Sequence, residues 1–434
     1  MIASSSMLGF FTIGLGPSCD HSVLPMRAAG RFCERLIQEG VTKKVHRLKV
    51  QVHGRFAHFS NLTGVCAAIL LGLQGATPND VEVDSIPGHL AGIRSMKSLR
   101  LPWGRVVAFN EARDIVFDAA AEDGIEFVAF DDAGNVLLSI CGIGTTSQNS
   151  SSVRRFPFQT GRELVRLSRE CSCDISTLML RHEASIRPEP ETREALWYVW
   201  KTMRQSVERG CAREQKPDGK AGPGCAAWLN RELSACQFSS LVDPLRALDW
   251  VDLWAIAVSE ENAAGGRVVA VPTNETAGIL PAVLHYIVRV HDRSNEEGIT
   301  RFMLTAGAIA AICAGPAIAA GVETSLGCAM AAGAMCDALG GSTAQVVNAA
   351  ALGLESHRGI RFTAAEYPAI GAPNAIAAVT AINTARLARH TGQGDDGLLL
   401  DRVISHLASS KPQTARGVSQ DHTPKTFLTM SPFA

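Results

Sequence analysis

Two patterns of hydrophobic and polar positions divide the chain near residue 150. Before that point, polar and apolar residues alternate with a period of two over 45–53, and an apolar run over 65–75 closes at a glycine. The first pattern predicts a strand and the second a helix. Two further strands are predicted over 124–130 and 135–140, paired around the turn residues between them. The pattern over residues 1–150 therefore predicts an α+β domain.

Helical periodicity dominates after a polar, turn-rich stretch that begins near residue 145. It predicts an all-α helical domain over residues 151–405. The final segment, residues 406–434, loses the periodicity and gains serine, threonine and proline, so we expect an extended tail there. The long apolar stretch at 302–335 is interrupted by Pro316 and Glu323, which predicts buried helices rather than a membrane span.

Composition and charge agree with two domains and narrow the class of expected partner. The 434 residues are 46% hydrophobic, enough for two ordinary cores. The 41 basic and 42 acidic side chains nearly cancel and form no long run of one sign, so we expect neither a nucleic acid nor a membrane as partner. The expected partners are a small molecule and a second copy of the chain, as a homodimer.

The cysteines and the beginning of the chain indicate the compartment. Twelve cysteines show no repeated spacing and many lie in apolar helical sequence, which is typical of reduced, buried thiols without disulfides. The apolar run at 8–15 has no basic lead and continues directly into a glycine loop, so we expect no cleaved signal peptide. Both features predict a cytoplasmic protein.

The first candidate site is the loop within "IGLGPSCDHSVLPMRAAGRF", residues 13–32. Gly14 and Gly16 allow a close approach of the backbone to a ligand, and a helix predicted to begin near Ser22 directs N–H groups and partial positive charge at it. Such a place suits a carboxylate. Ser18 can donate a hydrogen bond and His21 can transfer a proton near neutral pH. The alternative is a glycine-proline turn whose polar residues only cap the helix.

The second candidate site lies in "VSEENAAGGRVVAVPTNETAGILPAV", residues 258–283. The pattern predicts a helix that ends at the glycine pair, a short buried strand over 267–271, and a new helix capped by Thr273 and Asn274 with Glu275 in its first turn. A second helix N-terminus could hold an anion. The alternative is an ordinary capping pair without a ligand.

Together these two stretches resemble the iron-sulfur L-serine dehydratases, the L-serine ammonia-lyases. "GPSCDHSVLPM" (16–26) corresponds to the family's G-P-S-S-S-H-T-x-G-P-M, and "EENAAGGRVVAVPTN" (260–274) to its E-E-N-A-A-G-G-R-V-V-x-A-P-T-N. Further agreement lies in "VDSIPG" (83–88), "SICGIG" (139–144), "DALGGS" (337–342) and "NAIAAVTAINTARLA" (374–388). The resemblance spans roughly residues 10–390 and implies a fused two-domain chain with its active site between the β and α domains.

The chain departs from the family at the positions that hold its four-iron, four-sulfur cluster. The resemblance places Ala320 at the first ligand, a cysteine-free stretch at 361–374 over the next two, and no cysteine at the C-terminal end. Cys313, Cys328 and Cys336 are expected to be core residues. We therefore expect no cofactor and no metal; the alternative is a 4Fe-4S cluster moved to the pair Cys171 and Cys173 with Cys211 or Cys225.

The β domain departs as well, because "LTGVC" (62–66) replaces the family's G-H-H-T-D type motif. His53 and His58 lie just upstream and are candidates to replace its histidines. In the opening loop, Cys19 and Asp20 stand in place of two serines.

Three functions follow from this sequence. The first is a cluster-independent, lyase-like enzyme that performs elimination, addition, isomerisation or cyclisation on an amino acid or other small carboxylate. Its catalytic residues would be His21, with Asp20 as partner and Cys19 as a thiolate at a helix N-terminus. The second is an L-serine ammonia-lyase with a relocated cluster, and the third a non-catalytic ligand-binding or regulatory homologue. In each, the residues expected to bind the ligand are Ser18, Asn262, Thr273 and Asn274.

Overall fold

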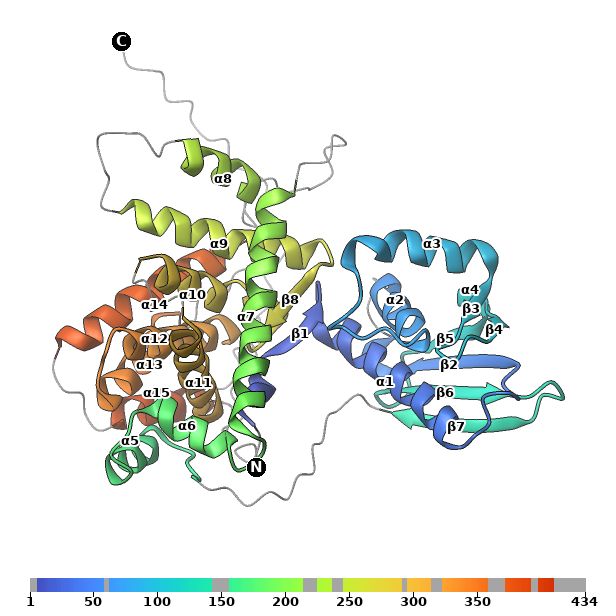
Figure 1. The fold of residues 1–434 in the computed structure, drawn as a ribbon, viewed down its shortest axis with the longest axis horizontal. Helices are drawn as coiled ribbons and strands as arrows, with labels where there is room; N and C mark the ends of the chain where they lie inside the picture. The colour runs from blue at the N-terminus through green and yellow to red at the C-terminus, as the bar shows by residue number, and fades with distance from the viewer. Residues whose placement is uncertain are drawn as a thin grey trace, which may run out of the picture.

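The structure is a computed structural model of the chain, and it describes residues 6–57, 62–142, 156–213, 225–235, 245–290, 295–313, 322–357, 371–391 and 397–409. Figure 1 shows two lobes, an N-terminal α+β lobe in blue to teal and a helical lobe in green to red. The predicted order of an α+β domain followed by a helical domain is confirmed.

A four-stranded sheet forms one layer of the N-terminal lobe. Its strand order is β5-β2-β6-β7, with β2 parallel to β5 and antiparallel to β6, and with β6 antiparallel to β7. The strands are β2 (Arg47–His53), β5 (Ile115–Asp118), β6 (Gly124–Phe130) and β7 (Val136–Gly142). The strands predicted at 45–53, 124–130 and 135–140 are thus confirmed.

Helices complete the N-terminal lobe. Helix α1 packs on α2 and contacts β6 and β7, and the rings of Phe32 and Phe127 stack at 5.4 Å in the core between helix and sheet. The helix predicted at 65–75 is α2, and Gly75, just beyond it, has a φ of +90°. The helices are α1 (Cys19–Gln38), α2 (Leu62–Leu73), α3 (Ile86–Met96) and the short α4 (Glu111–Asp114); a 3₁₀ turn, η3 (Val83–Ser85), precedes α3. A further 3₁₀ turn, η2 (Gly54–Phe56), follows β2, and β3 (Ser98–Arg100) pairs with β4 (Val106–Ala108).

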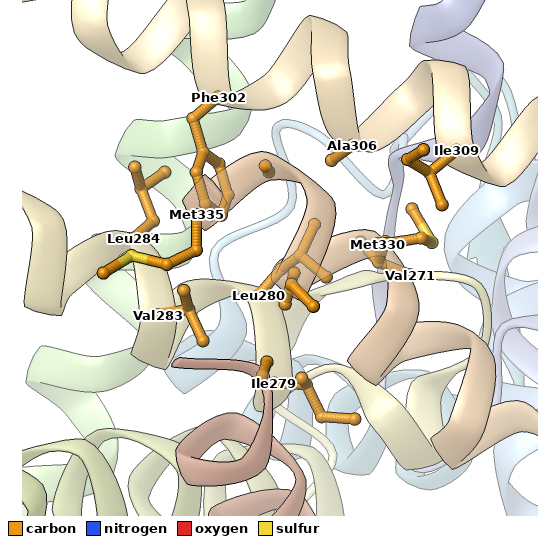
Figure 2. Close-up of a cluster of buried hydrophobic side chains, with 14 of the residues drawn as sticks. Val271, Ile279, Leu280, Val283, Leu284, Phe302, Ala306, Ile309, Met330 and Met335 are labelled. Atoms are coloured by element: carbon orange, nitrogen blue, oxygen red, sulfur yellow. The ribbon is translucent and has the colours of Figure 1, made fainter. Parts of the chain in front are cut away.

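The helical lobe surrounds α12, most of whose residues are buried and which packs against α10, α11, α13 and α14. Figure 2 shows apolar side chains that fill this core; apart from Val271, those labelled come from α10, α11 and α12. Its helices are α5 (Gly161–Glu170), α6 (Ile175–Glu183), α7 (Glu189–Ala212), α8 (Cys225–Ala235), α9 (Arg246–Ala263), α10 (Ile279–Val290), α11 (Glu296–Cys313), α12 (Glu323–Ala338), α13 (Thr343–Ser356), α14 (Ala372–His390) and α15 (Leu398–Ser409).

The apolar stretch at 302–335 contributes to the buried helices α11 and α12, as predicted. Within the ranges given above, no helix combines the length and the apolar character that crossing a membrane requires. Residues 410–434, most of the predicted tail, lie outside the described residues.

The first residues of the chain cross from one lobe to the other. Met7, Phe11 and Ile13 belong to the core of the helical lobe, whereas Leu15 belongs to that of the N-terminal lobe. The 3₁₀ turn η1 (Met7–Phe10) is held by the buried carboxylate of Glu183, which accepts the Met7 N–H at 2.5 Å and the Ser6 hydroxyl at 2.8 Å. Strand β1 (Thr12–Leu15) then pairs antiparallel with β8 (Arg267–Ala270), from Thr12 opposite Ala270 to Leu15 opposite Arg267. This two-stranded sheet joins the lobes (Figure 1).

Two predicted helix starts differ from the structure. Helix α1 begins at Cys19 with Ser18 as its N-cap residue, three residues before the predicted start, so His21 lies in the first turn of the helix. After Thr273 the chain forms only a 3₁₀ turn, η5 (Asn274–Thr276), and helix α10 begins at Ile279. The sequence Thr-Asn therefore begins a short turn and not the predicted long helix.

Candidate active site

A cavity of about 640 Å³ lies where the N-terminal lobe meets the end of α9. The helical lobe contributes small residues at the end of α9. The N-terminal lobe contributes the end of β1 and the loop after it, the start of α1, one face of α2, and the beginning of α3. The lining residues are Leu15, Gly16, Pro17, Ser18, His21, Ser22, Gly64, Ala67, Ala68, Leu71, Val83, Ile86, Pro87, Ala263, Ala264 and Gly265. The two sequence stretches singled out above thus meet at one cavity.

Gly16 sets the close approach between the two lobes. Its N–H donates to the carbonyl of Gly266 at 2.9 Å. A Cβ atom at Gly16 would lie 1.8 Å from the carbonyl oxygen of Asn262. On the facing side, Gly265 has a φ of +81°, a backbone conformation that favours glycine. The contact between the loop and the end of α9 therefore requires glycine on both sides.

Ser18 and His21 bring polar groups to the cavity. The Ser18 side chain makes no capping hydrogen bond, although the residue occupies the N-cap position of α1. The hydroxyl of Ser22 instead braces the loop, at 2.6 Å from the Leu15 carbonyl and 2.9 Å from that of Ser18. The first-turn N–H groups of a helix carry partial positive charge. This corner of the cavity can accept a carboxylate beside a titratable imidazole.

Cys19 and Asp20 lie in the first turn of α1 with His21. The structure describes their backbone, and their side chains lie outside the description. Their predicted roles as thiolate and as partner of His21 stay predictions.

Asn262 and Asn274 form a chain of hydrogen bonds behind the loop. The amide of Asn274 donates to Asn262 Oδ1 at 2.8 Å, and Asn262 Nδ2 lies 3.4 Å from the carbonyl oxygen of Pro17. Both asparagines are buried. Neither they nor Thr273 is among the residues that line the cavity; the Thr273 hydroxyl lies 3.4 Å from that of Thr276. Ser18 and His21 thus line the cavity, whereas Asn262 and Asn274 lie behind it and support the loop through Pro17.

No role for Glu261 follows from the sequence, whereas the structure shows it in buried ion pairs close to the cavity. Its fully buried carboxylate accepts Arg209 Nε at 2.6 Å and Arg213 Nη2 at 2.5 Å. Arg209 also donates to the carbonyl of Arg267 at 2.8 Å. Gly266 packs on this carboxylate so closely that a Cβ would lie 1.9 Å from Glu261 Oε1. The ion pairs therefore fix the turn between α9 and β8.

Glu260, the neighbouring residue, is also buried, and Arg213 acts on it through its charge. Its Oε1 accepts the N–H of Ala226 at 3.3 Å, and Oε2 has no hydrogen-bond partner. Burial raises the pKa of this carboxyl to about 7. Burial and the nearby Glu260 raise the pKa of the Cys211 thiol to about 11 and also raise that of Cys225.

Two side chains of the helical lobe hold the loop that precedes η3 and α3. Arg267 donates to the carbonyls of Pro78, at 3.0 Å, and Val81. The Tyr198 hydroxyl donates to the carbonyl of Asn79 at 2.8 Å. Sequence reasoning missed both, although an arginine opening an otherwise apolar strand was a usable signal.

The remaining sequence candidates lie elsewhere. His53 is the last residue of β2 and does not line the cavity, and His58 lies outside the described residues. Cys313, Cys328 and Cys336 are buried in helices, as predicted, and burial raises the pKa of each thiol.

No three His, Cys, Asp or Glu side chains group to hold a metal ion in the part of the chain that the structure describes, which includes Cys171, Cys173, Cys211 and Cys225. Ala320, most of the stretch at 361–374 and the C-terminal end lie outside that part.

Comparison with known proteins covers both lobes. Residues 6–144 match the family model described as serine dehydratase beta chain, and residues 170–419 match serine dehydratase alpha chain. An L-serine dehydratase of Streptomyces coelicolor is 36% identical over 449 residues, covering 95% of this chain and 97% of that protein. L-serine dehydratase 1 of Escherichia coli is 33% identical, with 92% and 93% covered. An L-serine dehydratase of Mycobacterium tuberculosis is 34% identical, with 93% and 94% covered.

Proposed function

The chain belongs to the iron-sulfur L-serine dehydratase family, and from this premise we propose that it is a lyase acting on a β-hydroxy amino acid such as L-serine. The observation that carries the proposal is the cavity that the loop after β1 shares with the end of α9. Ligand sites favour such boundaries between domains. The relatives named above are L-serine dehydratases, which supports this reaction and substrate class.

The expectation of an enzyme without a cofactor is wrong for this family, whose members are iron-sulfur enzymes. The described thiols do not fit such a cluster, because they form no group of three metal-binding side chains.

The start of α1 would hold the substrate carboxylate. No arginine or lysine is found among the described residues that line the cavity, so a carboxylate there must be held by dipoles and hydroxyls. The first-turn N–H groups of α1 and the uncommitted hydroxyl of Ser18 supply both. This arrangement fits one carboxylate at the polar corner of the cavity.

His21 would transfer the proton of the elimination. One imidazole nitrogen takes the proton from Cα and gives it to the leaving hydroxyl, which departs as water. The resulting enamine rearranges to an imine, and water converts the imine to a 2-oxo acid and ammonia. His21 lies in the first turn of α1, the same turn that would hold the carboxylate, and it lines the cavity.

Asn262 and Asn274 would act as positioning residues, since their hydrogen bonds end on the carbonyl of Pro17. Their predicted direct contact with substrate, and that of Thr273, stays a prediction. A rise in KM of Thr273→Val without loss of kcat would support that contact.

Two further properties are also proposals. We expect a homodimer in the cytoplasm, because charges of both signs nearly cancel and the cysteines are typical of reduced thiols. Light scattering of the purified chain tests the first, and fractionation of cells the second.

The test of the proposed function is release of ammonia and 2-oxo acid from L-serine by protein purified without oxygen. His21→Ala should lower the rate by roughly two to four orders of magnitude, the usual contribution of a positioned acid or base. His46→Ala is the matched control, because His46 is exposed and lies outside the cavity. Equal rates for both variants would remove His21 from the reaction. A wild-type chain without turnover of any β-hydroxy amino acid would overturn the proposal.

A further inference from the structure

One side of the cavity is lined by apolar residues, which the polar side chain of serine would not contact favourably. Gly64, Ala67, Ala68 and Leu71 line it from α2. Their spacing of three, four and seven residues places them on one face of the helix. Ala68 and Leu71 are buried and Ala67 is half-buried, so this face forms a continuous aliphatic surface.

The start of α3 extends this surface. Val83 and Ile86 are half-buried and line the same cavity, followed by Pro87. Among the described residues that line the cavity, the polar side chains come only from the loop after β1 and the start of α1. The lining is therefore divided into a polar corner and an aliphatic wall, which belong to different elements.

The size of the cavity exceeds the needs of serine. Cavities of roughly 300–1,000 Å³ hold drug-sized ligands, which are far larger than serine, and this cavity measures about 640 Å³. The side chain of serine ends in its hydroxyl and offers no apolar surface to the wall.

We propose that the preferred substrates are β-hydroxy amino acids whose β-carbon carries an aliphatic or aromatic substituent, which lies along the wall formed by α2 and the start of α3. This inference rests on the proposed function for its reaction, and it adds the substrate class. Burial of the substituent supplies binding free energy in proportion to its apolar area. Ala67 and Ala68 act as specificity-determining residues, because larger side chains there would occupy the space of the substituent.

The reaction of such a substrate balances without a further reactant. Cα loses a proton, the Cβ–O bond breaks, and the hydroxyl leaves with a proton as water. The enamine becomes an imine, which takes up one water and releases ammonia. The product is a 2-oxo acid that keeps the substituent, so the elimination does not alter the group that contacts the wall.

Calorimetry with unreactive ligands tests the inference on the full chain, purified without oxygen. L-Phenylalanine should bind at least tenfold more tightly than L-alanine, since even one methylene in an apolar pocket is worth about tenfold or more. Ala67→Leu should abolish most of this preference. Ala91→Leu, an equally sized change at an exposed position of α3 outside the cavity, should keep it.

Ile86→Ala provides a second variant on the opposite side of the wall, should Ala67→Leu fail to fold. It should lower the preference severalfold and leave the affinity for L-alanine unchanged, because it removes only apolar contact. Equal binding of the two ligands to the wild type, or a preference that survives in both wall variants, would overturn the inference.

Turnover separates this inference from the proposed function. 2-Oxo acid from 3-phenylserine at a higher kcat/KM than from L-serine supports both. 2-Oxo acid from L-serine, without any preference for L-phenylalanine, upholds the function and overturns the substrate class. A clear preference for L-phenylalanine with no 2-oxo acid from either hydroxy amino acid supports the apolar ligand class and overturns the proposed function.

Discussion

Gly16→Ala should impair catalysis and stability together, because the added Cβ has no room. It would lie 1.8 Å from the carbonyl oxygen and 2.6 Å from the carbonyl carbon of Asn262, where real contacts essentially never fall below 3.0 Å. That carbonyl cannot easily retreat, since it accepts the N–H of Gly265 at 3.0 Å and belongs to the end of α9. The loop after β1 must therefore move by on the order of 1 Å.

The cost of this movement can be estimated from the contacts that it breaks. Overpacking costs about 1–3 kcal/mol. Loss of the hydrogen bond from Gly16 to Gly266 adds roughly 1 kcal/mol, so the free energy of unfolding should fall by about 2–4 kcal/mol. Displacement of Ser18 and His21 by this amount should lower kcat/KM by about 100-fold.

Gly30→Ala is the matched control for this variant. Gly30 lies in the same helix α1 as His21, and a Cβ there would meet nothing within 4 Å. In a helix interior this change should stabilise the protein by about 0.5–1 kcal/mol and leave turnover unchanged. Urea unfolding followed by tryptophan fluorescence, together with initial rates of 2-oxo acid release, measures both effects. A Gly16→Ala protein with wild-type rate and stability would show that the lobes do not meet as described.

Three further changes test the support of the cavity. Burial raises the pKa of Glu260 to about 7 in the folded chain, above the usual 4.5. As pH rises between these values, the unfolded chain loses this proton while the folded chain keeps it, so the free energy of unfolding falls. Glu260→Gln should therefore flatten the fall of Tm from pH 5 to 7. Glu261→Gln should cost somewhat less than the roughly 3–5 kcal/mol of a fully buried pair, because Arg209 stays 27% exposed, and the measurement is urea unfolding. Asn274→Ala leaves Asn262 Oδ1 without its donor and should cost about 1–3 kcal/mol, with a matching drop in thermal stability; an unchanged Tm would contradict the hydrogen-bond chain.

Much of the fold could be predicted from local sequence patterns. The period of two over β2 and the turn between β6 and β7 are features of neighbouring residues, and both predictions are confirmed. The loop after β1 and the end of α9 were also singled out from the sequence, and they line one cavity. Glycines and polar residues clustered before a helix are a local signal that a sequence displays directly.

What the sequence could not provide depends on contacts between distant residues. The amide of Asn274 donates to Asn262, a partner that only the folded chain brings near. The apolar wall escaped notice because Ala67 and Leu71 have the same pattern as core positions of α2. The start of α1 was placed too late, since Ser18 and Ser22 are equally good caps in sequence terms.

The crossing of the first residues between the lobes has a consequence for how the protein is made. A ribosome releases β1 long before β8, and Met7 long before the Glu183 carboxylate that anchors it. The partners of this segment in the helical lobe are Glu183 and β8, so the N-terminal lobe must fold with its first strand still unpaired. Cutting the chain between residues 142 and 156 would leave that strand on the first fragment. The two fragments should then reassemble into one active enzyme when mixed, as complementing halves that share a sheet.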